Sequence, residues 1–374
     1  MTPTRSLYDL TLSELTEWMA AHNEPSYRAK QIFHASYHRP IREVAEIKEI
    51  PASLRQTLSR GFLLHTLISV DRKESSDGTI KWLSKLSDGE LLETVLIPAK
   101  KRLSISTAAP DASVHRRTVC VSTQVGCAYG CTFCASGMNG FRRNLTAGEI
   151  IQQVLLVQPR ITNVVFMGMG EPLANYDNLL KAIRILNSPE GLHIGARKIT
   201  VSTVGLIPMI ERLSKEGLQI ELSISLHAPN DEVRGKIMPV NKKYPVAELI
   251  KACRDYVKAT NRLITFEYIL IHGLNDSRDQ AKELVELLKN FKSKVNLIPC
   301  HPIPGTRLRQ SDAAPLPSSG SPWEQPPLPQ MIAFEKFLKE NGLLCTLRRS
   351  RGLDIEGACG QLRLRREASS SQLV

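Results

Sequence analysis

The sequence predicts an α/β protein, a partial (β/α)6 barrel that follows a small helical accessory domain and a β-meander. Three observations support this prediction. Strand-like and helix-like segments alternate from about residue 117 onward, which is typical of parallel strands joined by right-handed crossovers. Asp-Gly pairs separate three short strand-like runs before that point. Six alternating strands are too few for a closed eight-stranded barrel, so we expect an open barrel that binds ligands at the C-terminal strand ends.

The helical accessory domain is expected over residues 1–65. Thr11 and Glu14 have the spacing of a capping box at the start of a first amphipathic helix. A second helix is predicted over residues 27–37, and a third helix carries Leu58.

The β-meander is expected over residues 66–99, where it links the helical domain to the barrel. Asp77-Gly78 and Asp88-Gly89 are hairpin turn signals between apolar runs. The expected strands cover residues 65–70, 80–86 and 91–97.

The barrel is expected over residues 113–352. Its strands are predicted at residues 118–122, 163–167, 198–202, 219–226, 263–271 and 294–298. A capping-box pattern of Thr146 and Glu149 starts the first helix, which runs to about residue 158. The later helices are predicted at residues 178–186, 207–215, 247–260 and 278–289. Residues 302–329 contain eight prolines and are expected to form an exposed insertion. The final helix is predicted at residues 329–341 and the final strand at residues 343–348. Residues 353–374 are expected to form a loop followed by a disordered tail.

The composition limits the class of protein. The 49 Lys and Arg residues exceed the 37 Asp and Glu residues, and the net charge of +12 favours a polyanionic partner, with a solvated basic surface as the alternative. Eight cysteines in 374 residues do not make a disulfide scaffold, and their clustering indicates metal chemistry in a reducing compartment. No signal peptide or membrane-spanning stretch is evident, so we expect a cytoplasmic protein that has no contact with membranes.

Three cysteines form a C-x3-C-x2-C motif within eight residues, at Cys127, Cys131 and Cys134. Thiolates are the usual ligands of iron–sulfur clusters, and a four-iron cluster takes one protein ligand per iron. Three ligands therefore leave one iron open to an exogenous molecule. A structural zinc site would need four closed ligands, and the chain has no second C-x2-C pair. Inert thiols are the remaining alternative.

The motif resembles that of radical S-adenosylmethionine (SAM) enzymes, and further runs make the chain similar to the RlmN family of dual-specificity RNA methyltransferases. The resemblance covers nearly the whole chain, and the matching runs lie at residues 124–127, 141–146, 167–172, 225–230 and 351–361. It implies a radical SAM barrel, one [4Fe-4S] cluster, and methylation of adenosine C2 in 23S ribosomal RNA (peptidyl transferase region) and in the anticodon loop of certain transfer RNAs. The SAM molecule would chelate the open iron and be cleaved to a 5′-deoxyadenosyl radical.

The resemblance also implies which residues contact SAM. Glu171 would accept the SAM ammonium group, and His301 stands where the family usually has asparagine. Because neutral imidazole cannot replace both the donor and the acceptor of an amide, that contact is expected to differ. The implied contacts are Gly170, Glu171, Ser202, Ser225, Leu226, His227 and His301.

Three further residues are implied to act on the RNA. One SAM would methylate Cys359, and the radical from a second SAM would remove hydrogen from that S-methyl group. The resulting methylene would add to adenine C2, Glu93 would take the C2 proton, and Cys120 would release the product by forming a disulfide with Cys359. A buried thiol is the plain alternative for Cys359, and a surface carboxylate is the plain alternative for Glu93.

The implied partners are 23S ribosomal RNA, transfer RNA and an electron donor such as flavodoxin or ferredoxin, and a monomer is expected. Aromatic residues make up only 5% of the chain, which argues against recognition by rows of stacked bases. We expect phosphate contacts and extrusion of the target base instead. The candidate basic residues are Lys100, Lys101, Arg102, Arg116, Arg117, Arg142, Arg143, Arg348, Arg349 and Arg351.

Two alternatives remain open. A Cfr-type enzyme would use the same apparatus to methylate adenine C8. A non-catalytic iron–sulfur RNA-binding protein would need the cluster ligands and the basic surface, but not Cys120, Glu93 and Cys359 together.

Overall fold

The computed structural model describes residues 5–39, 41–98, 116–138, 140–157, 161–303 and 322–362. Several predicted features lie outside these described residues. They are the basic run Lys100, Lys101 and Arg102, residues 304–321 of the predicted insertion, and the chain after residue 362.

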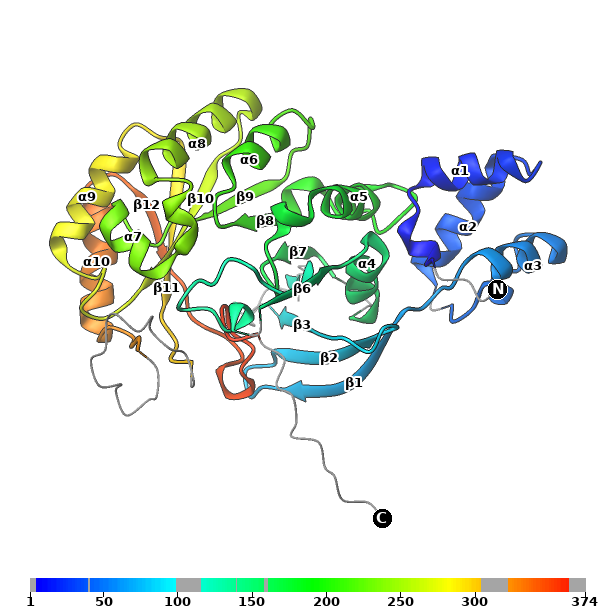
Figure 1. Cartoon of the computed structure of the whole chain (residues 1–374), viewed down its shortest axis with the longest axis horizontal. Coiled ribbons are helices and arrows are strands. Elements are labelled where there is room, and N and C mark those ends of the chain that lie inside the picture. Colours follow the sequence, from blue (N-terminus) through cyan, green and yellow to red (C-terminus); the bar gives the residue numbers. More distant parts are fainter. Residues whose placement is uncertain are drawn as a thin grey trace, which may run out of the picture.

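Ten strands of the described chain form one mixed sheet in the order β1-β2-β3-β4-β7-β8-β9-β10-β11-β12 (Figure 1). The first four strands are β1 (Leu67–Glu74), β2 (Ile80–Leu86), β3 (Leu91–Pro98) and β4 (Arg117–Cys120). The other six are β7 (Asn163–Phe166), β8 (Ile199–Thr203), β9 (Glu221–Ser225), β10 (Ile264–Leu270), β11 (Ser293–Pro299) and β12 (Leu344–Leu347).

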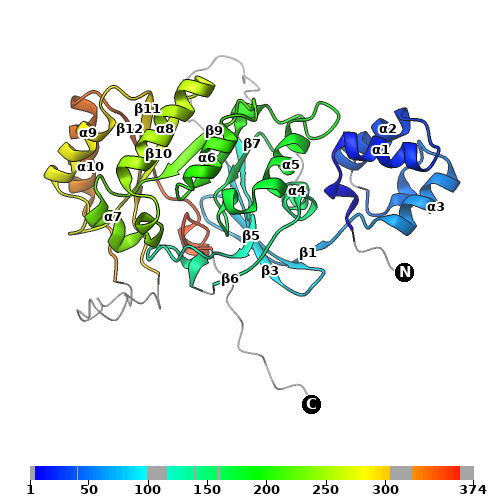
Figure 2. The same ribbon diagram turned by 45° about the horizontal axis from the view of Figure 1, so that its top comes forward.

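Strands β4 and β7 to β12 run parallel to one another in this sheet. This arrangement confirms the predicted strand–helix alternation. The six predicted barrel strands are β4 and β7 to β11, and the predicted strand 343–348 is β12, which adds a seventh parallel strand beside β11. The helices of this region are α4 (Ala147–Leu156), α5 (Tyr176–Asn187), α6 (Ile207–Leu213), α7 (Asp231–Ile237), α8 (Val246–Thr260), α9 (Arg278–Leu288) and α10 (Leu328–Glu340). Neighbouring helices pack in pairs, α4 on α5, α6 on α8 and α9 on α10, over the outer face of the sheet (Figures 1 and 2).

The predicted β-meander is part of the same sheet, because β3 pairs antiparallel with β4. Gly78 and Gly89 turn the chain between its strands with φ of 81° and 86°, a conformation that glycine adopts without strain. Strand β1 begins two residues later than predicted and extends to Glu74. Its last four residues, 71–74, are exposed and charged, so apolar patterning could not reveal them.

Two elements around the cysteine motif were not predicted. Strands β5 (Gln124–Gly126) and β6 (Phe141–Asn144) form an antiparallel hairpin that encloses the cysteine loop. At Gly126, where φ is 75°, a Cβ atom would lie 1.8 Å from the Gly140 carbonyl oxygen, so the closing strands leave no room for a side chain. Helix α7 was also missed; it is short and contains Gly235, a residue that disfavours helix.

Three N-terminal helices, α1 (Leu12–Ala21), α2 (Tyr27–His38) and α3 (Ala52–Gly61), pack together beside α4 and α5 (Figure 2). The predicted capping box of Thr11 and Glu14 is present. Contacts with α4 and α5 fix this unit to the barrel: Gly148 N donates to Asp9 Oδ1 at 2.7 Å, and Lys181 Nζ lies 2.6 Å from Glu14 Oε1.

The described end of the predicted insertion is not wholly exposed. Trp323 is half-buried and its Nε1 donates to Thr132 Oγ1, at 3.0 Å, in the cysteine loop. Pro326 is buried. Long-range contacts of this kind do not show in a proline-rich composition.

Candidate active site

The three motif cysteines line one cavity at the C-terminal ends of the parallel strands, which we call the cluster cavity. Backbone hydrogen bonds shape their loop: Cys127 N donates to Gly140 O at 3.1 Å, and Cys134 N donates to Cys131 O at 3.1 Å. Burial raises the pKa of Cys127 to about 12. Burial, followed by the neighbouring thiols, raises the pKa of Cys131 well above its usual value. Three half-buried thiols that oppose one another's ionisation are poised to bind a cation.

The donor set fits an iron–sulfur cluster better than a single ion. Within the described chain, no three His, Cys, Asp or Glu side chains converge closely enough to hold one metal ion. The three thiols instead stand around a shared cavity. That arrangement suits a polynuclear cluster whose fourth iron has no protein thiolate.

Five of the seven predicted SAM residues line the cluster cavity, namely Gly170, Glu171, Ser202, Ser225 and His227. Glu171 is 2% exposed and caps the turn that follows it: Leu173 N donates to Oε1 at 3.0 Å, and Val204 N donates to Oε2 at 2.8 Å. Burial raises its pKa to about 7, so a bound ammonium group would favour the carboxylate.

The glycines of the Gly168-Met169-Gly170 turn are required by chain packing. A Cβ atom on Gly168 would lie 2.7 Å from the Val121 carbonyl carbon. A Cβ atom on Gly170, where φ is 100°, would lie 2.8 Å from Gln124 N. The turn therefore packs directly against the segment that leads from β4 into the cysteine loop.

The other two predicted SAM residues do not line the cluster cavity. Leu226 is fully buried in the apolar core. His301 lies beside Ser350, with 2.5 Å between His301 Nε2 and Ser350 Oγ, and burial lowers its pKa.

His227 occupies the left-handed region, with φ of 61°. Its Nδ1 accepts a hydrogen bond from Ile269 N at 3.0 Å, and its ring meets the edge of Phe133 in the cysteine loop. Burial, and secondarily the Arg234 charge, lowers its pKa to about 3. The imidazole is therefore neutral at physiological pH, and its backbone contact orients the ring toward the cavity.

Cys120 and Cys359 line a second cavity, which we call the thiol cavity. It adjoins the cluster cavity, since Met167, Arg348 and Cys359 line both. Cys120 is the buried last residue of β4, whereas Cys359 is exposed, which contradicts the buried-thiol alternative. Burial, and then the nearby Cys359 thiol, raises the pKa of Cys120 to about 12.

The loop that carries Cys359 is held on two sides. On the meander side, Gly352 N donates to Asp77 Oδ2 at 3.0 Å, and Ser76 N donates to Asp354 Oδ2 at 3.1 Å. On the cluster side, Ala135 N donates to Gly360 O at 2.7 Å. Figure 1 shows this loop, in red, beside the meander strands. The fold thus places residue 359 at the cavity mouth although it lies more than 200 residues from the motif.

Glu93 is 5% exposed and lies beneath the same loop, which contradicts its reading as a surface carboxylate. Its Oε1 lies 2.9 Å from Lys81 Nζ, and Lys81 also donates to the Glu356 carbonyl oxygen at 3.2 Å. Glu93 does not line either cavity. Lys81 therefore links the predicted proton acceptor to the loop that carries Cys359.

Two residues of this region were missed from the sequence. Arg234 is fully buried, and its guanidinium donates to the carbonyl oxygens of Val204, Ser225 and Leu226 at 2.8, 3.1 and 3.1 Å. It therefore fixes the ends of β8 and β9. Glu267 is buried in the middle of β10, where it lines the cluster cavity. A carboxylate inside an apolar strand is a signal that could have identified Glu267; nothing in the sequence marks Arg234.

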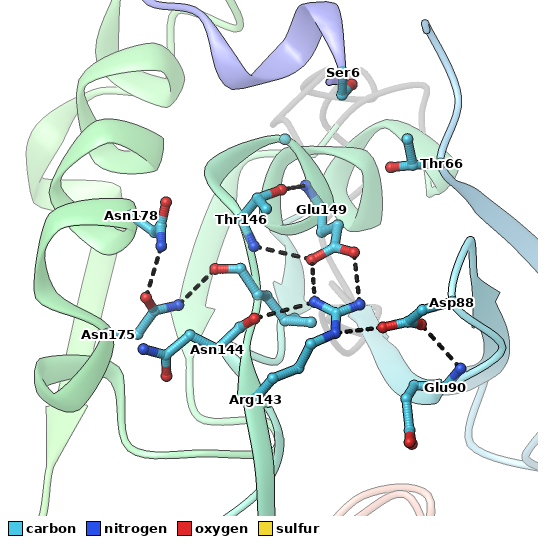
Figure 3. A network of polar contacts seen from close by, with 12 residues as sticks. Ser6, Thr66, Asp88, Glu90, Arg143, Asn144, Thr146, Glu149, Asn175 and Asn178 are labelled. Atoms are coloured by element: carbon cyan, nitrogen blue, oxygen red, sulfur yellow. Dashed lines mark hydrogen bonds and ion pairs between the residues drawn. The ribbon is translucent and has the colours of Figure 1, made fainter. Parts of the chain in front are cut away.

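Arg143, a predicted RNA contact, is bound within the protein (Figure 3). Its guanidinium forms a two-point ion pair with Glu149, at 2.8 and 2.9 Å, and its Nε lies 2.5 Å from Asp88. Glu149 also completes the predicted capping box of α4 with Thr146. The adjacent Arg142 has a more exposed ion pair, 3.1 Å from Glu90. Arg143 thus connects β6, α4 and the β2–β3 turn.

Sequence comparison identifies two regions. Residues 5–63 match the family profile described as "Ribosomal RNA large subunit methyltransferase N-terminal domain", and residues 121–288 match that of the radical SAM superfamily. The chain is 44% identical over 368 residues to a probable dual-specificity RNA methyltransferase RlmN of Geobacillus thermodenitrificans, with 96% of this chain and 93% of the relative covered. A Bacillus thuringiensis protein of the same description is 44% identical over 365 residues, covering 96% of this chain and 93% of the relative.

Structural comparison agrees. A crystal structure of a radical SAM methyltransferase from Sphaerobacter thermophilus matches with a TM-score of 0.83 and 45% identity, covering 96% of this chain and 99% of the other. In the described part of this chain, no helix is both long and apolar enough to cross a membrane. The radical SAM superfamily implies a [4Fe-4S] cluster and SAM, which the thiols of the cluster cavity suit. From its N-terminal helices to the Cys359 loop, the chain belongs to the RlmN family of radical SAM RNA methyltransferases.

Proposed function

We propose that this protein methylates C2 of an adenosine in the peptidyl transferase region of 23S ribosomal RNA and in the anticodon loop of transfer RNAs, through a methyl group carried by Cys359. One observation carries the proposal: Cys359 lines both the cluster cavity and the thiol cavity, and Cys120 lines the latter. A sulfur in that position can accept a methyl group from the side of the cluster cavity and form a disulfide with Cys120 in the thiol cavity.

Cys127, Cys131 and Cys134 would hold the cluster, and Gly170, Glu171, Ser202, Ser225 and His227 would hold SAM. When bound, these groups supply a 5′-deoxyadenosyl radical, and two SAM molecules are consumed per methylation. The electron comes from a donor such as flavodoxin or ferredoxin, and the enzyme works as a monomer.

The chemistry explains why a relay is needed. Adenine C2 is electrophilic, so it does not attack the positively charged methyl group of SAM as an amine would. Cys359 sulfur does so by displacement and becomes S-methylated. Arg348 lines both cavities together with Cys359, so its positive charge lies beside this sulfur at the junction of the two cavities. Removal of one methyl hydrogen atom leaves a carbon radical that forms a bond to C2.

Two residues complete the cycle. The adduct loses the C2 proton, which Glu93 takes, and one electron, which the oxidised iron–sulfur cluster would accept, and aromaticity returns. The Cys120 thiolate then attacks the Cys359 sulfur. The disulfide bond forms as the sulfur–carbon bond breaks, and the released carbon keeps the electron pair and takes a proton to become the methyl group. An external reductant must reset the disulfide.

The test compares three cysteine variants in reactions with RNA, SAM and reductant. Cys359→Ala should form no methylated RNA, because the carrier is gone. Cys120→Ala should accumulate a covalent protein–RNA adduct, because release is blocked. Cys253→Ala, which removes a buried thiol on α8, should behave as wild type.

Mass spectrometry of the digested RNA and of the protein provides the readout. Free 2-methyladenosine from Cys120→Ala would contradict the assigned roles. A wild-type product of 8-methyladenosine would instead identify the Cfr-type reaction.

A further inference from the structure

A third cavity lies within the partial barrel. It is lined by residues near the N-terminal ends of the parallel strands, on the opposite side from the cysteine motif. Its volume is about 590 Å³, which falls within the range of about 300–1,000 Å³ that is typical of sites for small ligands. Strand register accounts for its walls, because Thr118 pairs with Asn163 and Ser223 pairs with Thr265, and these side chains point inward. Barrel interiors are usually filled by apolar branched residues, whereas these walls are polar.

The charges around this cavity are mostly positive. Its two carboxylates have partners: Glu221 pairs with Arg262, and Glu267 accepts a hydrogen bond from Asn296 Nδ2 at 3.2 Å on Oε1 and lies 3.9 Å from Arg348 Nη1 with Oε2. Arg197, Lys294 and Arg349 form no ion pair with any of the described residues. The basic residues that line what we call the basic cavity are Arg116, Arg197, Lys294, Arg348, Arg349 and Arg351.

The basic cavity adjoins the two cavities of the active site. Met167 and Arg348 line all three. Arg349 and Arg351 line both the basic cavity and the thiol cavity. Arg116, Arg197 and Lys294 lie at the N-terminal strand ends, whereas Arg348, Arg349 and Arg351 follow the end of β12 and line the thiol cavity with Cys359.

We propose that the basic cavity binds the phosphates that flank the target adenosine, so that the RNA strand enters at the N-terminal strand ends and its extruded base passes Arg348 to reach Cys359. This inference rests on the proposed function. Guanidinium and ammonium groups without carboxylate partners are ready to bind phosphate. A base that is modified at a ring carbon must leave its stack, and the shared lining residues Met167 and Arg348 mark where it would pass from the basic cavity to the thiol cavity.

Charge-reversal variants of two residues that have no part in the proposed chemistry test this inference. Arg197→Glu and Lys294→Glu should each weaken binding of an anticodon stem-loop RNA about 10-fold and reduce the slope of log affinity against log salt by about one. Lys251→Glu makes the same charge change on the outer face of α8, where the side chain is 81% exposed, and should change the affinity less than about two-fold. Fluorescence anisotropy with the full-length protein at several salt concentrations gives both quantities.

The outcome can be separated from that of the proposed function. Methylation of Cys359 by SAM without RNA, measured on the tryptic peptide, should be equal in wild type, Arg197→Glu and Lys294→Glu. If wild-type Cys359 is never methylated, the proposed methyl transfer through Cys359 is wrong. The RNA-binding measurements still test whether the basic cavity binds RNA. Should either glutamate variant fold poorly, Arg197→Gln and Lys294→Gln provide the same comparison with smaller changes.

Two results would overturn the inference. One is RNA affinity in the cavity variants that falls no more than in Lys251→Glu. The other is displacement of the RNA by adenosine 5′-monophosphate at a concentration equal to that of the RNA, which would indicate a site for a small nucleotide instead of a strand.

Discussion

Basic side chains at the two ends of the parallel sheet have different roles: at one end they are hydrogen-bonded within the fold, and at the other they line a cavity. At the C-terminal end, Arg234 is fully buried and its guanidinium donates to backbone carbonyls and to Asn241. At the N-terminal end, within the described residues, Arg197 and Lys294 line a cavity without ion-pair partners. Both sets contribute to a net charge of +12, but only the second set is available to a ligand.

This difference shows that a count of basic residues does not locate an RNA site. Desolvating a guanidinium is costly unless each donor finds an acceptor, so a buried arginine is committed to the fold. Arg143 was predicted to bind phosphate and instead joins three elements of the structure. The distinction between committed and available cations leads to three predictions.

The largest effect is expected for Arg234→Lys, which keeps the charge and removes the planar fork of donors. Lysine cannot serve the carbonyls of Val204, Ser225 and Leu226 together, and a buried acceptor without a donor costs about 1–3 kcal/mol. We expect the free energy of unfolding to fall by about 3–5 kcal/mol, measured by chemical denaturation.

Arg254→Lys is the matched control. Arg254 is half-buried on α8, and its guanidinium makes two long contacts of 3.4 Å to backbone carbonyls. Its replacement should cost less than about 1 kcal/mol. Equal losses in the two variants would mean that burial of Arg234 does not distinguish it from an ordinary surface-facing arginine.

A second, smaller effect separates two neighbouring arginines in β6. Arg143→Ala removes the two-point ion pair with the buried Glu149 and the contact with Asp88 (Figure 3), and should destabilise the protein by about 2–3 kcal/mol. Arg142→Ala removes only a more exposed pair with Glu90 and should cost less than about 1 kcal/mol. Thermal unfolding of both variants would show the difference, and a reversed order would refute the structural assignment of Arg143.

The smallest effect concerns pH. The pKa of His227 is lowered to about 3 by burial and by Arg234, so the folded state resists protonation that the unfolded chain accepts near pH 6.5. The stability that neutral His227 contributes is present above pH 6.5 and is lost as pH falls toward 3. Between pH 7.5 and 5.5 the loss should be about 1.4 kcal/mol.

His227→Asn removes the titrating group and retains both an acceptor and tolerance of a positive φ. Its free energy of unfolding should therefore fall less than that of wild type over this pH interval. His193→Asn replaces an exposed histidine whose φ, 50°, is also positive, and should leave the wild-type pH dependence unchanged. The same slope in all three proteins would show that His227 is not held neutral.

Local features were predictable because their causes are local. Thr11 with Glu14, and Thr146 with Glu149, form capping boxes within four residues, and Gly78 and Gly89 make turns that depend on their own φ angles. The alternating segments of the barrel were found because short, mainly apolar strands alternate along the chain with amphipathic helices. Strand β1 was placed imperfectly because most of it is exposed.

By itself, the sequence determined the type of chemistry: three thiols at a fixed spacing, a glycine turn after a strand, and a cysteine between small residues. Only the tertiary structure decided which distant groups share a cavity. Lys81 contacts the loop of Cys359 across 275 residues, and Arg348 joins three cavities. Such pairings depend on sheet order and on burial, and the energy of a charge depends on what surrounds it, so no local pattern records whether a basic residue supports the fold or faces a ligand.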